Sequence, residues 1–188
     1  MLYVPAAHGA ATPAPLVLML HGAGQSSDEG IRPFLPLAES EGFVLLAPDS
    51  RGRTWDFLYG PYGADVAFID QALGYVFRRC AIDPARITVE GFSDGASYAL
   101  SLGLTNGDLF SHIVAFSPCI LAPAAHVGRP RIFISHGTDD RVLPVDRCGR
   151  ALAKRLENDG YAVSYDEFTG RHAVPSDVAR RAAAWLRG

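Results

Sequence analysis

The chain has few of the features that mark proteins binding nucleic acids or charged membranes. Among its 17 basic residues Lys154 is the only lysine, and the formal net charge is −3 over 188 residues. Without an excess of basic residues, neither nucleic acid nor an anionic lipid surface is expected as the main partner.

Cysteine is also scarce. The three cysteines, Cys80, Cys119 and Cys148, are widely spaced and form no Cys-x-x-Cys pair, and their odd number gives no disulfide framework. Residues 1–5 lack the basic start and the apolar stretch of a signal peptide. We therefore expect reduced cysteines and a cytoplasmic protein.

Long apolar runs are absent, although 48% of the residues are hydrophobic. The longest runs, such as residues 16–20 and 43–48, are too short to span a bilayer, so no stable membrane insertion is expected. Runs of this length suit buried strands. The length predicts a single domain over residues 1–188, with room for a substantial core.

What the chain does contain is a regular alternation of short apolar runs and longer helical patterns. Such alternation predicts an α/β fold, a mainly parallel sheet with helices on both faces. Asp65 is expected to cap a helix. Residues that directly follow a strand are the informative ones, because sites in such sheets lie at the carboxyl ends of the strands. Strands are expected at residues 16–20, 43–47, 86–91, 113–116, 131–135 and 162–168, and helices at residues 28–41, 65–79, 94–104, 145–158 and 176–186.

Residues 91–95 read Gly-Phe-Ser-Asp-Gly, a Gly-x-Ser-x-Gly motif between a predicted strand and a predicted helix. This context is what a nucleophile elbow requires, a tight turn that lifts the serine above the end of the sheet. Gly91 and Gly95 keep side chains out of the turn, and Ser93 lies at the positive end of the following helix. An ordinary Gly/Ser turn is the alternative. The position between strand and helix favours Ser93 as a nucleophile.

A serine hydroxyl is a weak nucleophile and needs a base. His172 follows the last predicted strand, so its loop lies at the same edge of the sheet as Ser93. The base in turn needs an acid that orients it and stabilises its charged form. Asp139 and Asp140 follow the fifth predicted strand, and spacing alone does not choose between them. The chain order serine, aspartate, histidine is the order of α/β-hydrolases.

The loop after the first strand reads His-Gly-Ala-Gly-Gln and has the small residues that an oxyanion hole needs. Its expected donors are the backbone N–H groups of Ala23 and Asp94. A phosphate-binding turn is the alternative, but neither GxxxxGK[ST] nor GxGxxG is present. His136 and the two aspartates could together suggest a metal site, but a catalytic role explains this cluster more economically. Neither a metal nor a cofactor is therefore expected.

Candidates for contact with a substrate come from two loops. Trp55, in the aromatic-rich loop after the second strand, is expected to line the acyl or alcohol pocket, and packing of that loop onto the body is an equally weighted alternative. Cys119 and Ile120 follow the fourth strand and are further candidates. Residues 117–130 form too short a segment for a large lid, so an open site is expected.

These motifs resemble the α/β-hydrolase superfamily over nearly the whole chain. The sequence looks like its small carboxylesterase/phospholipase group, which includes acyl-protein thioesterases, and like neighbouring feruloyl-esterase and polyhydroxybutyrate-depolymerase-like proteins. The matching stretches are LMLHGAGQ, GFSDGAS, SHGTDDRVLP and GRHAVP. The resemblance implies Asp140 rather than Asp139 as the acid, His172 as the base, and Ala23 and Asp94 as the oxyanion donors.

The resemblance further implies a serine hydrolase that cleaves small-molecule carboxylic esters through an acyl-enzyme. A thioesterase, lysophospholipase, peptidase or acyltransferase on the same residues is one alternative, and a non-catalytic receptor or binding protein is another. Members of the group usually have one or two further N-terminal strands, where this chain has only residues 2–4. An open edge there would allow pairing with another chain, including a homodimer.

Overall fold

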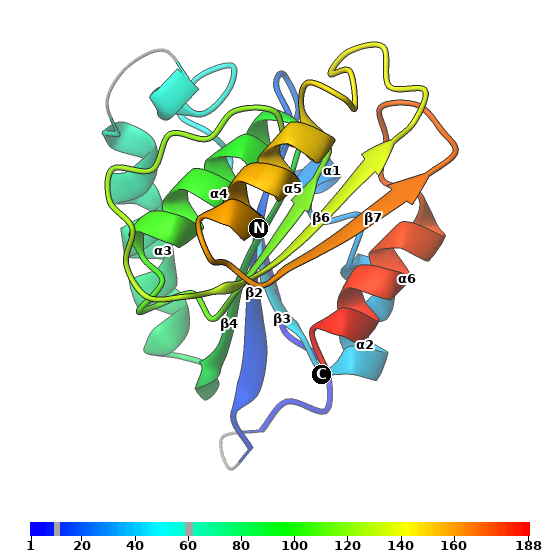
Figure 1. The fold of residues 1–188 in the computed structure, drawn as a ribbon. Coiled ribbons are helices and arrows are strands. Elements are labelled where there is room, and N and C mark those ends of the chain that lie inside the picture. The colour runs from blue at the N-terminus through cyan, green and yellow to red at the C-terminus, as the bar shows by residue number, and fades with distance from the viewer. Residues whose placement is uncertain (10–11, 59–61) are drawn as a thin grey trace.

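The computed structural model describes residues 1–9, 12–58 and 62–188, and its centre is a seven-stranded sheet (Figure 1). The order in the sheet is β1-β3-β2-β4-β5-β6-β7, and every neighbouring pair is parallel except β1 with β3. The predicted α/β-hydrolase fold is thereby confirmed. The strands are β1 (Leu2–Tyr3), β2 (Ala14–Leu20), β3 (Val44–Leu46), β4 (Ile82–Phe92), β5 (His112–Phe116), β6 (Arg131–Gly137) and β7 (Val163–Phe168).

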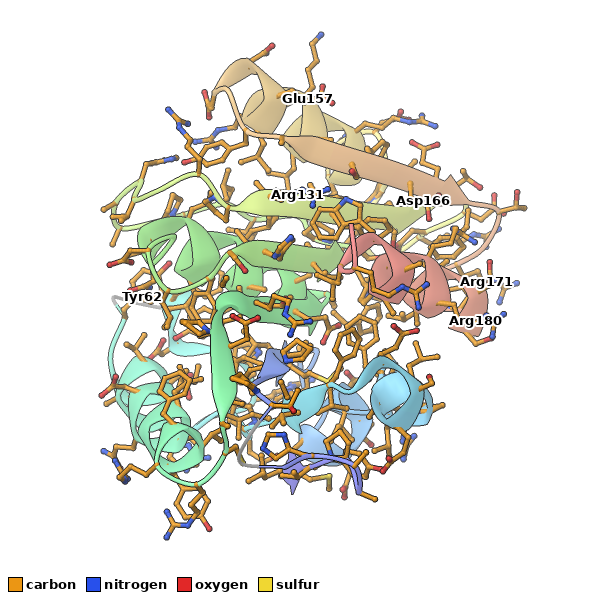
Figure 2. The ribbon with its side chains drawn as sticks, turned by 90° about the horizontal axis from the view of Figure 1, so that it is seen from below. Tyr62, Arg131, Glu157, Asp166, Arg171 and Arg180 are labelled. Carbon is orange, nitrogen blue, oxygen red and sulfur yellow. A yellow bond between two sulfur atoms is a disulfide. The ribbon has the colours of Figure 1, made fainter. Side chains whose placement is uncertain are left out.

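Helices cover both faces of the sheet (Figure 1). One face packs against α3 (Ala64–Phe77), α4 (Asp94–Thr105) and α5 (Gly149–Asn158). The other packs against η1 (Leu35–Leu37), α2 (Ala38–Glu41) and α6 (Ser176–Trp185). Along β2 the side chains alternate between the two cores, as a strand buried on both faces requires. Charged side chains such as Glu157 on α5 and Arg180 on α6 project outward (Figure 2).

The expected helix over residues 28–41 is wrong as one continuous element. The structure has α1 (Ser27–Gly30), then η1 and α2, with an irregular stretch between α1 and η1. Pro33 and Pro36 explain the break, because proline lacks the N–H that a helix uses and disfavours helical backbone in the residue before it.

Asp65 does not cap α3, contrary to expectation, because the N-cap is Gly63 and Asp65 lies in the first turn. The buried carboxylate instead accepts the backbone N–H of Arg51 at 2.6 Å and that of Asp56 at 2.8 Å. Asp65 therefore anchors the loop that follows β3, where η2 (Asp56–Leu58) lies.

Cys119 and Cys148 form a disulfide, so the expectation of three reduced cysteines is wrong. The partners lie 29 residues apart, in the loop after β5 and at the N-cap of α5, and no short motif marks such a pair. Cys80 is the free cysteine. A cytoplasmic location stays a prediction that has lost this support.

The edges and loops of the sheet bear on two further expectations. The chain supplies its own edge strand, β1, next to β3, and a homodimer stays a prediction. Residues 117–130, between β5 and β6, hold no helix or strand, which agrees with the absence of a large lid.

None of the helices in the described residues combines the length and the apolar character needed to cross a bilayer.

Candidate active site

Ser93 occupies the turn between β4 and α4, with φ 57° and ψ −117°. A positive φ is rare for residues other than glycine and persists only where the surroundings impose it. Here the Ser93 N–H donates to the Phe116 carbonyl at 2.9 Å, and the Ser97 N–H donates to the Ser93 carbonyl at 3.1 Å. These bonds fix the turn at the carboxyl end of the sheet.

The two glycines of the motif are required by backbone contacts. A Cβ on Gly91 would lie 2.2 Å from the Gly95 carbonyl oxygen, and a Cβ on Gly95 would lie 2.0 Å from the Leu20 carbonyl oxygen. Any side chain at either position would therefore push α4 away from the sheet and displace the serine between them.

The imidazole of His172 lies between Ser93 and Asp140. Its Nε2 is 2.9 Å from the Ser93 Oγ, and its Nδ1 is 2.6 Å from the Asp140 Oδ2. The ring also packs against Phe92, with 4.7 Å between ring centroids. With the proton on Nδ1 directed at the carboxylate, the Nε2 lone pair is left facing the Ser93 hydroxyl.

The Asp140 side chain is completely buried, whereas the neighbouring Asp139 is exposed. The Asp140 Oδ1 accepts the backbone N–H of Val142 at 2.9 Å and that of Leu143 at 2.8 Å. Burial acts to raise the pKa of this carboxyl, but the hydrogen bonds from the Leu143 N–H and from His172 outweigh burial and lower the pKa below its ordinary value. Asp140 is therefore ionised at neutral pH.

A second imidazole, that of His136, packs beside the same carboxylate. Its Nε2 donates to the Leu143 carbonyl at 2.7 Å and lies 3.3 Å from the Asp140 Oδ2. Burial lowers the pKa of His136, so this ring is neutral at neutral pH and packs uncharged against the Asp140 carboxylate. In the part of the chain that the structure describes, no group of three or more histidine, cysteine or acidic side chains is arranged for a metal ion.

The loop after β2 faces the elbow, and most of its backbone N–H groups already have acceptors. The Gly22 N–H donates to the Gln25 Oε1 at 2.9 Å, and the Gly24 N–H donates to the Arg53 carbonyl at 2.8 Å. The Gln25 N–H donates to the Gly22 carbonyl at 3.1 Å. From Gly22 to Gln25, only the Ala23 N–H has no acceptor among the described residues.

His21 fixes the direction in which the Ala23 N–H points. The Ser50 N–H donates to the His21 Nε2 at 3.0 Å, so Nδ1 carries the proton and donates to the Gly22 carbonyl at 2.8 Å. The N–H and C=O of a trans peptide point in opposite directions, so anchoring this carbonyl aims the Ala23 N–H the other way. The Asp94 N–H, in the first turn of α4, also lacks an acceptor among the described residues. Both amides are free for a developing negative charge.

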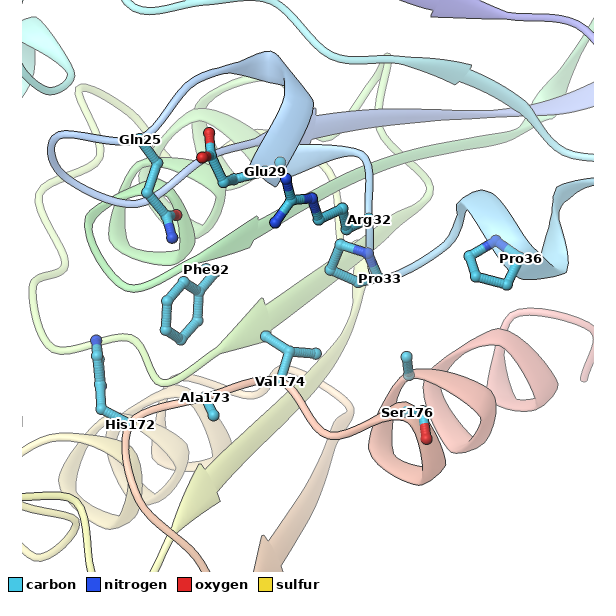
Figure 3. Close-up of a pocket in the computed structure, with 12 residues that line it drawn as sticks. Gln25, Glu29, Arg32, Pro33, Pro36, Phe92, His172, Ala173, Val174 and Ser176 are labelled. Carbon is cyan, nitrogen blue, oxygen red and sulfur yellow. The ribbon is translucent and has the colours of Figure 1, made fainter.

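A cavity of about 400 Å³ opens beside His172 (Figure 3). It lies between the segment after β2 and the segment that leads into α6, and Figure 3 shows Phe92 between Gln25 on one side and His172 and Val174 on the other. Phe92 and Val174 give it an apolar lining, and the exposed Arg32 adds a positive charge. The cavity has room for one side of a small ester.

Trp55 contacts neither this cavity nor the solvent, so the expectation that it lines a substrate pocket is wrong. Its side chain is 0% exposed and packs between His21 and Tyr98, at centroid distances of 4.9 and 5.1 Å. Its indole N–H donates to the His21 carbonyl at 2.9 Å. The alternative, packing of the loop onto the body, is what the structure has.

Cys119 and Ile120 follow β5, beside the elbow. Their backbone N–H groups both donate to the Ser97 Oγ on α4, at 3.1 Å each. The sulfur of Cys119 is bonded to Cys148 and offers no thiol, while the Ile120 side chain is 46% exposed. Contact of these two residues with a substrate stays a prediction.

Comparison with known sequences finds one family and several relatives. Residues 66–187 match the family described as Phospholipase/Carboxylesterase. A probable feruloyl esterase C of Aspergillus niger is 28% identical over 163 residues, which is 82% of this chain and 59% of the relative. Acyl-protein thioesterase 1 of Gibberella zeae is 30% identical over 108 residues, which is 52% of this chain and 46% of the relative. The chain spans about half the length of the curated relatives it matches.

Solved structures share the fold over the full chain. The crystal structure of esterase PE8 has a TM-score of 0.81 and 26% identity, over 100% of this chain and 96% of the other. A phospholipase/carboxylesterase from Dyadobacter fermentans has a TM-score of 0.74 and 22% identity, over 100% and 95% of the two chains.

Proposed function

We propose that this chain, which belongs to the phospholipase/carboxylesterase family, hydrolyses carboxylic esters through an acyl-enzyme intermediate on Ser93. The observation that supports this most is the line of contacts from the Ser93 Oγ through His172 to Asp140, at 2.9 and 2.6 Å. The backbone N–H groups of Ala23 and Asp94, which have no acceptor among the described residues, belong to the loop facing the elbow and to the elbow itself.

In the acylation step, the Ser93 Oγ attacks the ester carbonyl carbon while the His172 Nε2 takes the hydroxyl proton. The new O–C bond moves the carbonyl π electrons onto the oxygen, and the Ala23 and Asp94 N–H groups stabilise this oxyanion. Asp140 stabilises the imidazolium. When the intermediate collapses, the bond to the alcohol oxygen breaks, and His172 donates its proton to that oxygen.

Deacylation repeats the same steps with water. His172 removes a proton from a water molecule, whose oxygen attacks the acyl carbon, and the oxyanion forms again at the Ala23 and Asp94 amides. Collapse of this second intermediate breaks the bond to the Ser93 Oγ, which recovers its proton from His172. The products are a carboxylic acid and the free serine, so the cycle requires neither a metal nor a cofactor.

The cavity beside His172 is proposed to bind one side of a small ester, and Ile120 to contact the other side. The partly apolar lining, with Phe92 and Val174, suits a short acyl chain or an aromatic ring. Thioesters are the second candidate substrates, because one relative is named an acyl-protein thioesterase.

The test combines labelling with turnover. The purified chain is treated with a fluorophosphonate probe, and the labelled peptide is identified by mass spectrometry. In parallel, p-nitrophenyl esters and acyl thioesters of matched chain lengths are assayed. Labelling at Ser93 with ester turnover supports the proposal, and faster thioester turnover would assign the chain to the second candidate. A folded chain that neither labels nor turns over any substrate would be a non-catalytic binding protein.

A further inference from the structure

Three residues of the loop after β3, Arg53, Thr54 and Trp55, form a short strap across the active-site edge. Two of them bind the loop that carries the first proposed oxyanion donor. The Arg53 carbonyl accepts the Gly24 N–H at 2.8 Å. The indole N–H of Trp55 donates to the His21 carbonyl at 2.9 Å. These contacts hold the two peptide groups that flank the one carrying the Ala23 N–H, the first proposed donor.

Thr54 connects the strap to the second proposed donor. Its hydroxyl donates to the Asp94 Oδ2 at 2.9 Å. Thr54 is 5% exposed, and among the described residues no other hydrogen bond reaches the Asp94 carboxylate. The backbone N–H of this same Asp94 is the second donor, so three consecutive residues contact both halves of the oxyanion hole.

We propose that this strap positions the oxyanion hole, with Thr54 and Trp55 as positioning residues that never touch the substrate. The proposal rests on the function proposed above, since the direction of the Ala23 and Asp94 N–H groups affects the reaction rate only if Ser93 attacks a carbonyl. Such amides accelerate a reaction when they are held in place before charge develops, because no reorganisation is then needed.

The strap is itself held at both ends. The buried Asp65 carboxylate accepts the N–H of Arg51, just before the strap, and that of Asp56, just after it. The Asp65 N–H donates to the Asp56 Oδ2 at 3.0 Å. Trp55 also stacks on Tyr98 of α4, with an interplanar angle of 14°. The first turn of α3 and the helix after Ser93 therefore fix the strap against the sheet.

A role in packing alone predicts a different outcome from a positioning role. If Trp55 and Thr54 only fill space, their substitution lowers thermal stability and leaves the turnover of the folded protein unchanged. If they position the amides, substitution lowers kcat and weakens the binding of a tetrahedral adduct, while KM changes little because the ground-state carbonyl needs the amides less.

The experiment uses substitutions that remove one hydrogen-bonding group each. Trp55→Phe deletes the indole N–H and keeps an aromatic ring. Thr54→Val deletes the hydroxyl and keeps the shape of the side chain, whereas Thr54→Ser keeps the hydroxyl. Trp185→Phe is the matched control, because its indole N–H donates to the Ser164 Oγ at 2.9 Å on β7, away from the site. Folding is checked by circular dichroism and thermal denaturation.

The readouts are kcat and KM for a p-nitrophenyl ester and the inhibition constant of a trifluoromethyl ketone, which adds to the serine as a tetrahedral adduct. We expect Trp55→Phe and Thr54→Val each to lower kcat about 10-fold and to weaken ketone binding by a similar factor, with KM within about 2-fold. Thr54→Ser should recover most of the loss, and Trp185→Phe should match the wild type.

The strap proposal is overturned if folded Thr54→Val keeps wild-type kcat, or if Trp185→Phe loses as much as Trp55→Phe. Should Trp55→Phe fail to fold, the Thr54→Val and Thr54→Ser pair decides alone, because it changes only one hydroxyl. Failure of the proposed function is recognised separately: the wild type then neither labels at Ser93 nor hydrolyses esters. A wild type that does both, with unaffected strap variants, rejects the strap alone.

Discussion

The Asp140 carboxylate lies 2.6 Å from the His172 Nδ1 and is fully buried, while its sequence neighbour Asp139 is exposed. Two chemically identical side chains one residue apart thus have different surroundings. Only Asp140 receives the N–H groups of Val142 and Leu143, which keep it ionised against the imidazole. Asp139 and Asp140 therefore allow the same substitution to be compared at two positions that differ only in their surroundings.

Asp140→Asn is expected to lower kcat by about 10⁴-fold, because an amide favours the wrong tautomer of the histidine and does not stabilise its charged form. Asp139→Asn is expected to change kcat by less than about 3-fold, as a surface substitution. Steady-state kinetics on one ester measure both. Equal losses in the two variants would leave the acid unassigned.

Ser93→Ala is expected to reduce ester hydrolysis by roughly 10⁴-fold or more and to abolish fluorophosphonate labelling. Ser40→Ala, at an exposed position on α2, is the control and should retain both activities. The measurement is the initial rate at saturating ester, with gel fluorescence for the label. Ester turnover that survives in purified Ser93→Ala would rule out this serine as the nucleophile.

In the candidate site, the sequence predicts the proximity of residues that follow a strand end. The elbow around Ser93, the loop at Ala23 and the loop at His172 each lie within a few residues of an apolar run, so local pattern and sheet geometry suffice to bring them together. Sequence spacing alone does not select Asp140, because Asp139 has nearly the same distance from the strand end. Its selection depends on which carboxylate the turn after β6 buries.

Other features depend on contacts between distant residues and leave no local signal. The aromatic-rich loop predicts a pocket position and a packed position for Trp55 equally well, and a hydrogen bond to the His21 carbonyl, 34 positions away, places it in the core. Thr54 carries no local signal of its role, since its partner Asp94 is 40 positions away. The Cys119–Cys148 pair is another such case.

Loss of the disulfide is expected to lower the free energy of unfolding by about 3.5 kcal/mol, since closing a loop of this length restricts the unfolded chain. The pair closes a separation of 29 residues. Chemical denaturation of Cys119→Ser, and of the wild type with and without reductant, measures the effect. Cys80→Ser is the control, because Cys80 is free. Wild type that is equally stable with reductant would show that the pair adds nothing to stability.

Glu90 gives a prediction about pH. This residue of β4 is 1% exposed, lies between Met19 and Val114 in the sheet, and has one carboxylate oxygen without a hydrogen-bond partner among the described residues. Burial raises the pKa of this carboxyl well above its ordinary value. Between the ordinary pKa and the raised pKa, the folded chain holds a proton that the unfolded chain releases, so stability falls as pH rises through that range.

Glu90→Gln removes this proton linkage while keeping the shape and polarity of the side chain. The stability of the variant relative to the wild type is expected to be greater at pH 8 than at pH 4 by about 1.4 kcal/mol for each unit by which burial raises the pKa. Denaturant unfolding at the two pH values measures the difference. Glu157→Gln, an exposed position on α5, should show no such dependence. A constant stability difference between wild type and Glu90→Gln across this range would mean that Glu90 titrates normally in the folded chain.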